Sequence, residues 1–326
     1  MSNIDKKIFS VGFTPDCTYE DIDEFFDRYH QVLQSVYCSP PISAVGTEIT
    51  SVDMFNNFTE DAKYLGRFNH FIKKSKEYKV DFDLVVNGNK LTDAQFDEIH
   101  KWIDILEPSE ITTMESYVDQ FRKLIATNGY NIDLVRSHNN GPLRHSEVVL
   151  GKFDRYIFAK RELWDPTSWT DDPSKTRLLV NNCCIWSCPG CYREGNSKTT
   201  KQIFKDEIVK FGFEKVMARS SILPEDLHLI HSYFPEVQYK LNTRTHPMKI
   251  TLQLMKDFVN GTKTVSLMNR VGANSNTANL SSMHKHGQFN EYISNAPIDV
   301  FKLLSAKKEM QDLFKDKAAL RLDNTK

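Results

Sequence analysis

The sequence predicts a (β/α)8-type, TIM-like barrel, and three observations lead to this fold class. Short apolar segments alternate along the chain with segments whose apolar residues recur at helical spacing, which is typical of parallel βα units. The chain has 326 residues, and this length favours a barrel over an open doubly wound sheet. Polar residues follow many of the apolar segments, at the end where a parallel barrel carries its active site.

Nine segments are expected to form strands, one more than a (β/α)8 barrel contains, so one of them is an extra strand or a false assignment. Their ranges are 8–13, 33–38, 80–89, 110–114, 131–140, 155–163, 178–180, 213–221 and 237–246. Helices are expected at 18–31, 59–78, 91–104, 115–128, 224–234, 247–261 and 299–317. Thr18 and Asp21 form a capping box at the start of the first helix.

The expected domain organisation is a barrel over residues 1–262 and a C-terminal extension over residues 263–326 that packs on it. The extension begins with a segment rich in Asn, Ser, Thr, Gly and His, which shows little periodicity and is expected to be loop or extended cover. The terminal helix follows this segment.

Composition limits the possible partners. The net charge of −1 gives no signal for nucleic-acid binding, and no apolar run is long enough to cross a membrane. The first residues contain no apolar signal core, so the expected location is the cytoplasm. In that reducing compartment, clustered thiols serve as metal ligands more often than as disulfides.

Four of the six cysteines lie within nine residues, directly after the apolar segment 178–180. Cys184, Cys188 and Cys191 have the spacing C-x3-C-x2-C, and Pro189-Gly190 allows a sharp turn between them. Thiolates that converge on one point select zinc or an iron–sulfur cluster. The alternative is a group of buried cysteines without a metal.

The residues that follow the other strands predict a polar, cationic pocket for an anionic or strongly polar substrate. The candidate catalytic residues are Arg136, His138, Lys160, Arg161, Lys240 and Arg244. The alternative for each is a surface position or a structural ion pair. The histidines lack zinc-hydrolase spacing, and the chain contains no Walker, G-x-G-x-x-G or G-x-S-x-G motif.

Four segments in the same order and spacing resemble the collagenase-like peptidase family: AKREL, LLVNNCCIWSCPGC, SSILPEDL and YKLNTRTHP. The resemblance covers roughly residues 80–262. It implies an α/β barrel with a [4Fe–4S] cluster held by four cysteines. Several family members serve oxygen-independent hydroxylation of RNA bases or of a quinone precursor, some with prephenate as the oxygen donor.

The resemblance implies that Cys184, Cys188 and Cys191 are clustered iron ligands and that Asn181 binds the cofactor. Cys38, at the end of the second expected strand, is the candidate for the distant fourth ligand. Cys183 is its rival, and Cys17 is a weaker third choice.

Two departures from the family point away from RNA. Asn242 replaces the acidic residue of the family segment KIEGR, and the chain lacks the C-terminal domain typical of RNA-modifying members. We therefore expect an oxygen-independent hydroxylase-type enzyme, or a subunit of one, that acts on a polar or anionic small molecule. A second barrel subunit is a candidate partner, and peptidase activity is not expected.

Three alternatives remain open. The spacing C-x3-C-x2-C also occurs in radical S-adenosylmethionine enzymes, where three cysteines leave one iron open for the cofactor. The late position of the motif and Gly190, where an aromatic residue is usual, count against that interpretation. The other two alternatives are a non-catalytic barrel with a structural or sensing cluster, and structural zinc.

Overall fold

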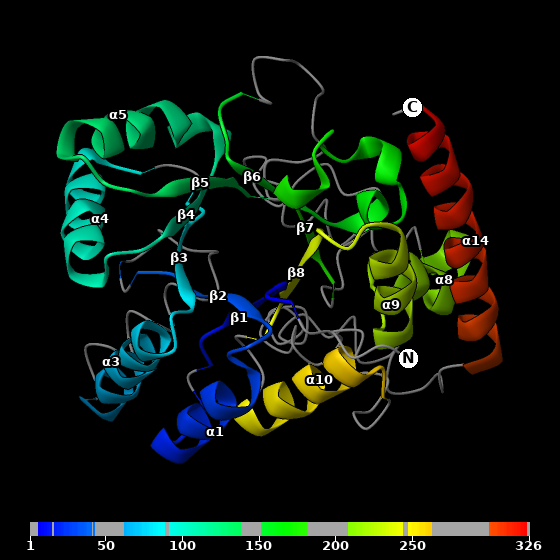
Figure 1. The fold of residues 1–326 in the computed structure, drawn as a ribbon, viewed down its shortest axis with the longest axis horizontal. Coiled ribbons are helices and arrows are strands. Elements are labelled where there is room, and N and C mark those ends of the chain that lie inside the picture. Colours follow the sequence, from blue (N-terminus) through cyan, green and yellow to red (C-terminus); the bar gives the residue numbers. More distant parts are fainter. Residues whose placement is uncertain are drawn as a thin grey trace.

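Eight parallel strands form a closed barrel in which each strand pairs with the next and the last pairs with the first (Figure 1). The strands are β1 Phe9–Gly12, β2 Leu33–Cys38, β3 Asp81–Val86, β4 Glu110–Thr113, β5 Asp133–Arg136, β6 Arg155–Phe158, β7 Thr176–Leu179 and β8 Gln238–Leu241. This computed structural model describes residues 6–14, 16–40, 42, 62–88, 91–137, 151–180, 208–243, 247–262 and 300–324. The predicted (β/α)8-type barrel is confirmed.

The described α-helices lie around the barrel and follow β1, β2, β3, β4, β7 and β8, whereas short 3-10 turns follow β6 (Figure 1). They are α1 Tyr19–Tyr29, α3 Ala62–Glu77, α4 Asp93–Leu106, α5 Val118–Asn128, α8 Phe213–Ser220, α9 Pro224–Tyr233, α10 Met248–Asn260 and α14 Val300–Asn324. Short 3-10 turns lie at η1 Glu115–Tyr117, η3 Lys160–Trp164, η4 Pro166–Ser168 and η5 Pro173–Lys175. The capping box of α1 is confirmed, because the Asp21 amide donates to Thr18 Oγ1 and the Thr18 amide donates to Asp21 Oδ2.

The prediction of a strand at 213–221 is wrong, because this segment forms α8. Its apolar residues Phe213 and Val216 are three positions apart, and good helix formers such as Glu214, Lys215 and Ala218 lie between and after them. Val216 is its sole β-branched residue, so strand propensity is weak. Without this segment, the expected strands number eight and the barrel closes.

Helix α14 attaches to the outside of the barrel through buried cations. Lys307, 3% exposed, donates from Nζ to Asp226 Oδ2 at 2.8 Å, and the same carboxylate oxygen accepts the Leu223 amide before α9. Near the other end of α14, Arg321 donates to the carbonyl oxygens of Pro166 and Thr170. The helix is longer than the predicted range of 299–317, and the rest of the extension lies outside the described residues.

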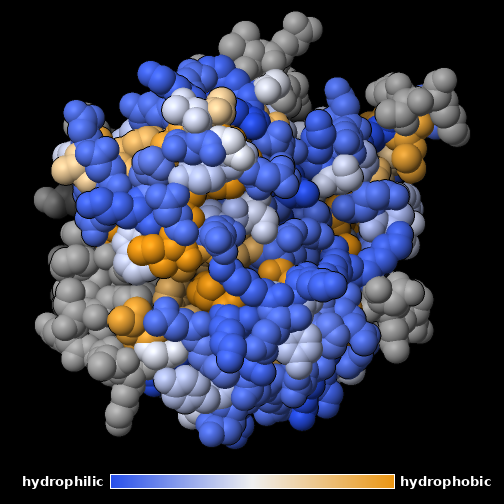
Figure 2. Space-filling view, turned by 60° about the vertical axis from the view of Figure 1, so that its left-hand side comes forward, coloured by the Kyte–Doolittle hydropathy of each residue, from blue (hydrophilic) through white to orange (hydrophobic). Residues whose placement is uncertain are grey.

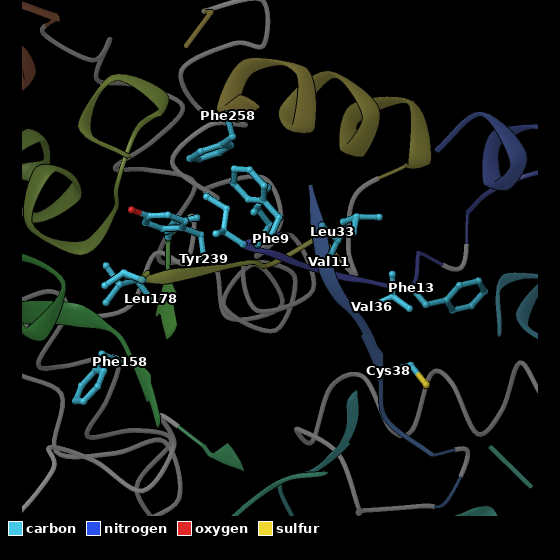
Figure 3. Close-up of a cluster of buried hydrophobic side chains, with 14 of the residues drawn as sticks. Phe9, Val11, Phe13, Leu33, Val36, Cys38, Phe158, Leu178, Tyr239 and Phe258 are labelled. Atoms are coloured by element: carbon cyan, nitrogen blue, oxygen red, sulfur yellow. The ribbon is translucent and has the colours of Figure 1, made fainter. Parts of the chain in front are cut away.

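The outward faces of the strands and the helices share one large apolar core. Figure 3 shows part of it, with Phe9 of β1 close to Phe258 of α10, and with Val11 and Val36 farther from that helix residue. The outer surface differs from this core: the face in Figure 2 is mainly hydrophilic, with hydrophobic residues gathered in a smaller area near its centre. None of the described helices has the length and apolar character that crossing a membrane requires.

The interior of the barrel is divided into an apolar and a charged part. Val135 of β5, Ile157 of β6 and Leu179 of β7 form a small apolar cluster with Ala159, which directly follows β6. The rest of the interior contains ion pairs that join strands which are not neighbours, so their side chains meet across the interior. The alternation of side chains along each strand produces this separation from the outer core.

Arg177 of β7 is the centre of one of these ion pairs. It is fully buried and donates to both carboxylate oxygens of Glu110 in β4, at 2.9 and 3.0 Å. It also donates to Gln238 Oε1 in β8, at 3.1 and 2.8 Å. Arg155 of β6 contacts the same Glu110 and also Asp133, at 3.0 Å from its carboxylate. One carboxylate therefore links three strands inside the barrel.

Glu110→Gln tests the contribution of this network to stability. The substitution keeps the side-chain volume but removes the bidentate carboxylate partner of the buried Arg177 and leaves it the more distant Asp83 carboxylate, at 3.8 Å. Breaking a buried ion pair in this way costs about 3–5 kcal/mol of unfolding free energy. Urea unfolding measures the loss. The control is Glu107→Gln, which removes the exposed pair with Lys76 and should leave the unfolding free energy unchanged. Equal effects of the two substitutions would contradict the proposed importance of the buried pair.

A second stability prediction concerns Asp81, whose Oδ2 accepts a hydrogen bond from Gln34 at 2.7 Å. Burial, and then the nearby Glu110 charge, raise the pKa of Asp81. As pH rises above about 4, the unfolded chain releases this proton before the folded chain does, so the wild-type protein loses stability. Asp81→Asn removes this loss. Its stability relative to wild type should increase from pH 4 to pH 7, as measured by urea unfolding at several pH values.

The exposed Asp97→Asn is the matched control for this pH series. It should follow the wild-type pH dependence throughout. A stability difference between Asp81→Asn and wild type that stays constant across the pH range would show that the Asp81 proton is not responsible.

Candidate functional site

Lys240 of β8 and Asp83 of β3 form the central polar pair of the barrel interior. Lys240 Nζ donates to Asp83 Oδ2 at 2.9 Å, and the two residues are 5% and 0% exposed. Asp83 also accepts hydrogen bonds from Thr112 in β4, from its amide at 3.0 Å and from its hydroxyl at 2.8 Å. Because three strands hold this pair, the ammonium group has little freedom to move.

Tyr37 of β2 completes the pair on one side. Lys240 Nζ lies 3.9 Å from the centroid of the Tyr37 ring, a distance typical of a cation–π contact. The Tyr37 hydroxyl donates to the carbonyl of Leu241 in β8 at 2.6 Å, so the side chain crosses over β1. The β1 residue in register with Tyr37 is Gly12, which has no side chain to obstruct that path.

The chain leaves β7 beside Lys240. The Val180 amide donates to the Lys240 carbonyl at 3.0 Å, and the Val180 carbonyl accepts the Ile222 amide at 2.8 Å. Asn181 follows directly in the sequence. The end of β7 therefore lies next to the Lys240–Asp83 pair.

Arg136, a predicted catalytic residue, does not meet Lys240. Its neighbour Val135 belongs to the interior cluster, so alternation turns Arg136 toward the helices. Its Nε donates to Glu115 Oε1 in η1 at 2.7 Å, and its register partner is Tyr156, which belongs to the outer core. With 2% of its surface exposed, Arg136 holds the start of α5 against β5, and the expectation that it faces the mouth is corrected.

The remaining predicted catalytic and cofactor residues cannot be placed in the same way. His138, Arg244 and Asn181 lie outside the described residues, as do the side chains of Lys160 and Arg161 in η3. Lys240 is thus the predicted cation that the described structure places inside the barrel, where Asp83 balances its charge.

The described part of the chain offers no metal site of its own. Cys184, Cys188 and Cys191 lie outside the described residues, and so does Cys183. Among the residues that are described, no group of three or more His, Cys, Asp or Glu side chains could hold a metal ion. The thiolate chemistry of the cysteine motif suits an iron–sulfur cluster. The support for an iron–sulfur cluster therefore comes from the sequence of the cysteine motif.

The two described cysteines lie in the outer core. Cys38 is 1% exposed and follows Tyr37, which faces the interior, so Cys38 faces the helix layer (Figure 3). Cys17 is 4% exposed, and burial raises the pKa of its thiol to about 12. This pKa disfavours the thiolate that metal binding requires. The ligand role of Cys38 stays a prediction, and its orientation toward the helices gives it no support.

Asp83, Thr112 and Tyr37 were not among the predicted site residues. A signal for Asp83 was present in the sequence, because VDFDLVV places Asp81 and Asp83 two positions apart in an otherwise apolar strand. Alternation then puts both carboxylates on the same face. Tyr37 and Thr112 have no comparable signal, since aromatic and β-branched residues are common in any strand.

Comparisons with known proteins identify no family for this chain. No family model matches the chain, and no curated protein matches it. Similar solved structures include a variant of the tryptophan synthase α-subunit from Pyrococcus furiosus, with 10% identity, a TM-score of 0.40, and coverage of 84% of this chain and 99% of that one. N-acetylneuraminate lyase from Fusobacterium nucleatum has 11% identity, a TM-score of 0.35, and coverage of 95% and 99%. At these values neither neighbour informs the activity.

Thiol labelling tests the description of Cys17. In the native protein at pH 8, iodoacetamide should leave Cys17 unmodified for hours, because the side chain is buried and its thiol stays protonated. In urea the same residue should react within minutes. Peptide mass spectrometry measures both rates, and the unfolded chain is the control. Equal rates in the two states would show that Cys17 is accessible in the native protein.

Proposed function

We propose that the protein is an iron–sulfur α/β-barrel enzyme that acts on a polar small molecule at the carboxyl ends of its strands. The observation that supports this most directly is the hydrogen bond between the Val180 amide and the Lys240 carbonyl. It places Val180, from which the chain continues to the cysteines, beside a buried ammonium–carboxylate pair. Cys184 follows Val180 by four residues, which span at most about 14 Å. A cluster held by this segment would therefore lie near Lys240.

The chain's own residues can be assigned definite roles under this proposal. Cys184, Cys188 and Cys191 would supply thiolates to the cluster, which provides electron-transfer or Lewis-acid chemistry when bound. Lys240 would orient the substrate or donate a proton from Nζ, while Asp83 holds that ammonium group at 2.9 Å. The reducing cytoplasm, the expected location, would keep the cysteines available as thiolates.

The reaction class is a finer proposal that depends on the resemblance of the four segments. Oxygen-independent hydroxylation requires an oxygen donor other than dioxygen, which the protein would bind together with its substrate. A second barrel subunit, the expected candidate partner, could bind either the oxygen donor or the substrate. Both statements stay predictions.

The orientation of Cys38 favours a second candidate function. If Cys38 stays in the outer core, three clustered cysteines remain, and Cys183 or an exogenous ligand must complete the cluster. S-adenosylmethionine at an open iron would meet this requirement and would make the protein a radical enzyme. The position of the motif after β7, the seventh strand, continues to count against this candidate.

Metal analysis of anaerobically purified protein tests the proposal. We expect about four irons and four sulfides per chain, with a brown colour and a broad charge-transfer absorption, as for a cubane cluster. Cys188→Ala should lose most of the iron. A colourless protein that carries one zinc per chain, or an iron content unchanged in Cys188→Ala, would contradict the proposal.

Cys38→Ala in the same preparation separates the two candidates. If Cys38 is the fourth ligand, the substitution should make the cluster labile, and S-adenosylmethionine should leave the wild-type spectrum unchanged. If the iron is open, Cys38→Ala should retain its cluster, and S-adenosylmethionine should change the electron paramagnetic resonance spectrum of the reduced protein.

A further inference from the structure

Two buried polar atoms at the carboxyl ends of neighbouring strands lack hydrogen-bond partners in the described structure. They are the Ser39 hydroxyl, directly after β2, and the Asn87 side-chain oxygen, directly after β3. Ser39 is 0% exposed and Asn87 is 4% exposed. A buried polar group without a partner costs about 1–3 kcal/mol, so two at adjacent positions require an explanation.

Both side chains lie on the interior side of the barrel by strand alternation. Ser39 follows Tyr37 by two residues, and Asn87 follows Asp83 by four, so each shares the face of a residue that contacts Lys240. Cys38 and Leu84 are in register between β2 and β3. Extending this register places Ser39 and Asn87 one strand and two residues apart, a separation of about 8 Å. That separation is short enough for one small molecule to bridge the two groups.

The Lys240–Asp83 pair forms the floor beneath these two groups. The ammonium and the carboxylate are 2.9 Å apart and cancel each other's charge. The next cation, Arg177, lies 3.8 Å from the Asp83 carboxylate and is itself neutralised by Glu110. Among the described residues, a ligand above this floor therefore meets hydrogen-bonding groups with little net charge.

We infer that Ser39 and Asn87 form a hydroxyl-binding subsite and that the ligand at this end of the barrel is a polyhydroxylated small molecule. A ligand hydroxyl can donate a hydrogen bond to the Asn87 side-chain oxygen. With the Ser39 hydroxyl it can act either as donor or as acceptor. It also suits both orientations of the Asn87 amide. This inference names the substrate class of the proposed active site and in that respect rests on the proposed function. The subsite itself consists of described residues, so polyol binding does not require an iron–sulfur cluster.

Three six-carbon probes separate hydroxyl recognition from anion recognition. Sorbitol has hydroxyls and no charge, gluconate has hydroxyls and a carboxylate, and hexanoate has a carboxylate without hydroxyls. Ligand-detected NMR titration of the full-length protein should show saturable binding of sorbitol and gluconate with affinities within about threefold of each other. Hexanoate should show no saturation.

Two nearly isosteric variants assign the binding to the subsite. Ser39→Ala and Asn87→Leu should each weaken sorbitol binding about tenfold, because each removes one hydrogen bond. Neither should lower the unfolding midpoint, since each removes a buried polar atom that has no partner in the described structure, the Ser39 hydroxyl or the Asn87 side-chain oxygen. A structural role for these side chains would predict the opposite effect on stability.

Thr113→Val is the matched control. Its hydroxyl is also fully buried without a partner in the described structure, but its register partner Val86 belongs to the outer core. Thr113 therefore faces the helices, and the substitution should leave sorbitol binding unchanged.

Three results would overturn the inference: no saturable polyol binding, hexanoate binding as tightly as gluconate, or full affinity in both Ser39→Ala and Asn87→Leu. Absence of polyol binding would mean that these two groups contact water and no ligand. Equally tight binding of hexanoate would mean that the site recognises the carboxylate. Iron analysis of the same preparation is independent of these results. A protein that lacks iron but binds sorbitol would refute the proposed function and retain the subsite.

Discussion

The buried ion pairs inside the barrel constrain the rest of the structure. Arg177–Glu110 and Lys240–Asp83 each connect strands from opposite parts of the barrel, and their members are at most 5% exposed. A charge at such depth is tolerated when its partner and its hydrogen bonds are in place, so strand register and barrel closure must be correct together. The interior thus favours one register over its alternatives.

The same ion pairs fix the position of the polar groups near the carboxyl ends of the strands. Asp83 and Tyr37 restrict Lys240 from two strands, while the apolar cluster of Val135, Ile157, Ala159 and Leu179 fills the other part of the interior. The polar groups therefore face one part of the mouth, next to the point where the chain leaves β7 at Val180. A preorganised ammonium group costs little reorganisation when a ligand binds.

The sequence predicted the fold well because the pattern that defines a βα barrel is local. The predicted range of β2 is the observed one, and Thr18 caps α1 as expected. The assignment at 213–221 failed because a short apolar segment is ambiguous between helix and strand until its neighbours are known. The packing of α8 against α14, which is distant in sequence, decides it.

Side-chain direction separates what the sequence determined by itself from what the tertiary structure decided. Alternation, strand order and the cysteine spacing are readable from the chain, because each depends on residues that are close in sequence. Arg136 and Lys240 both end strands, yet one binds Glu115 outside the barrel and the other binds Asp83 inside it. Cys38 likewise ends β2 but faces the outer core. The two faces of a strand become interior and exterior only when the sheet closes, and closure depends on contacts between residues far apart in the chain.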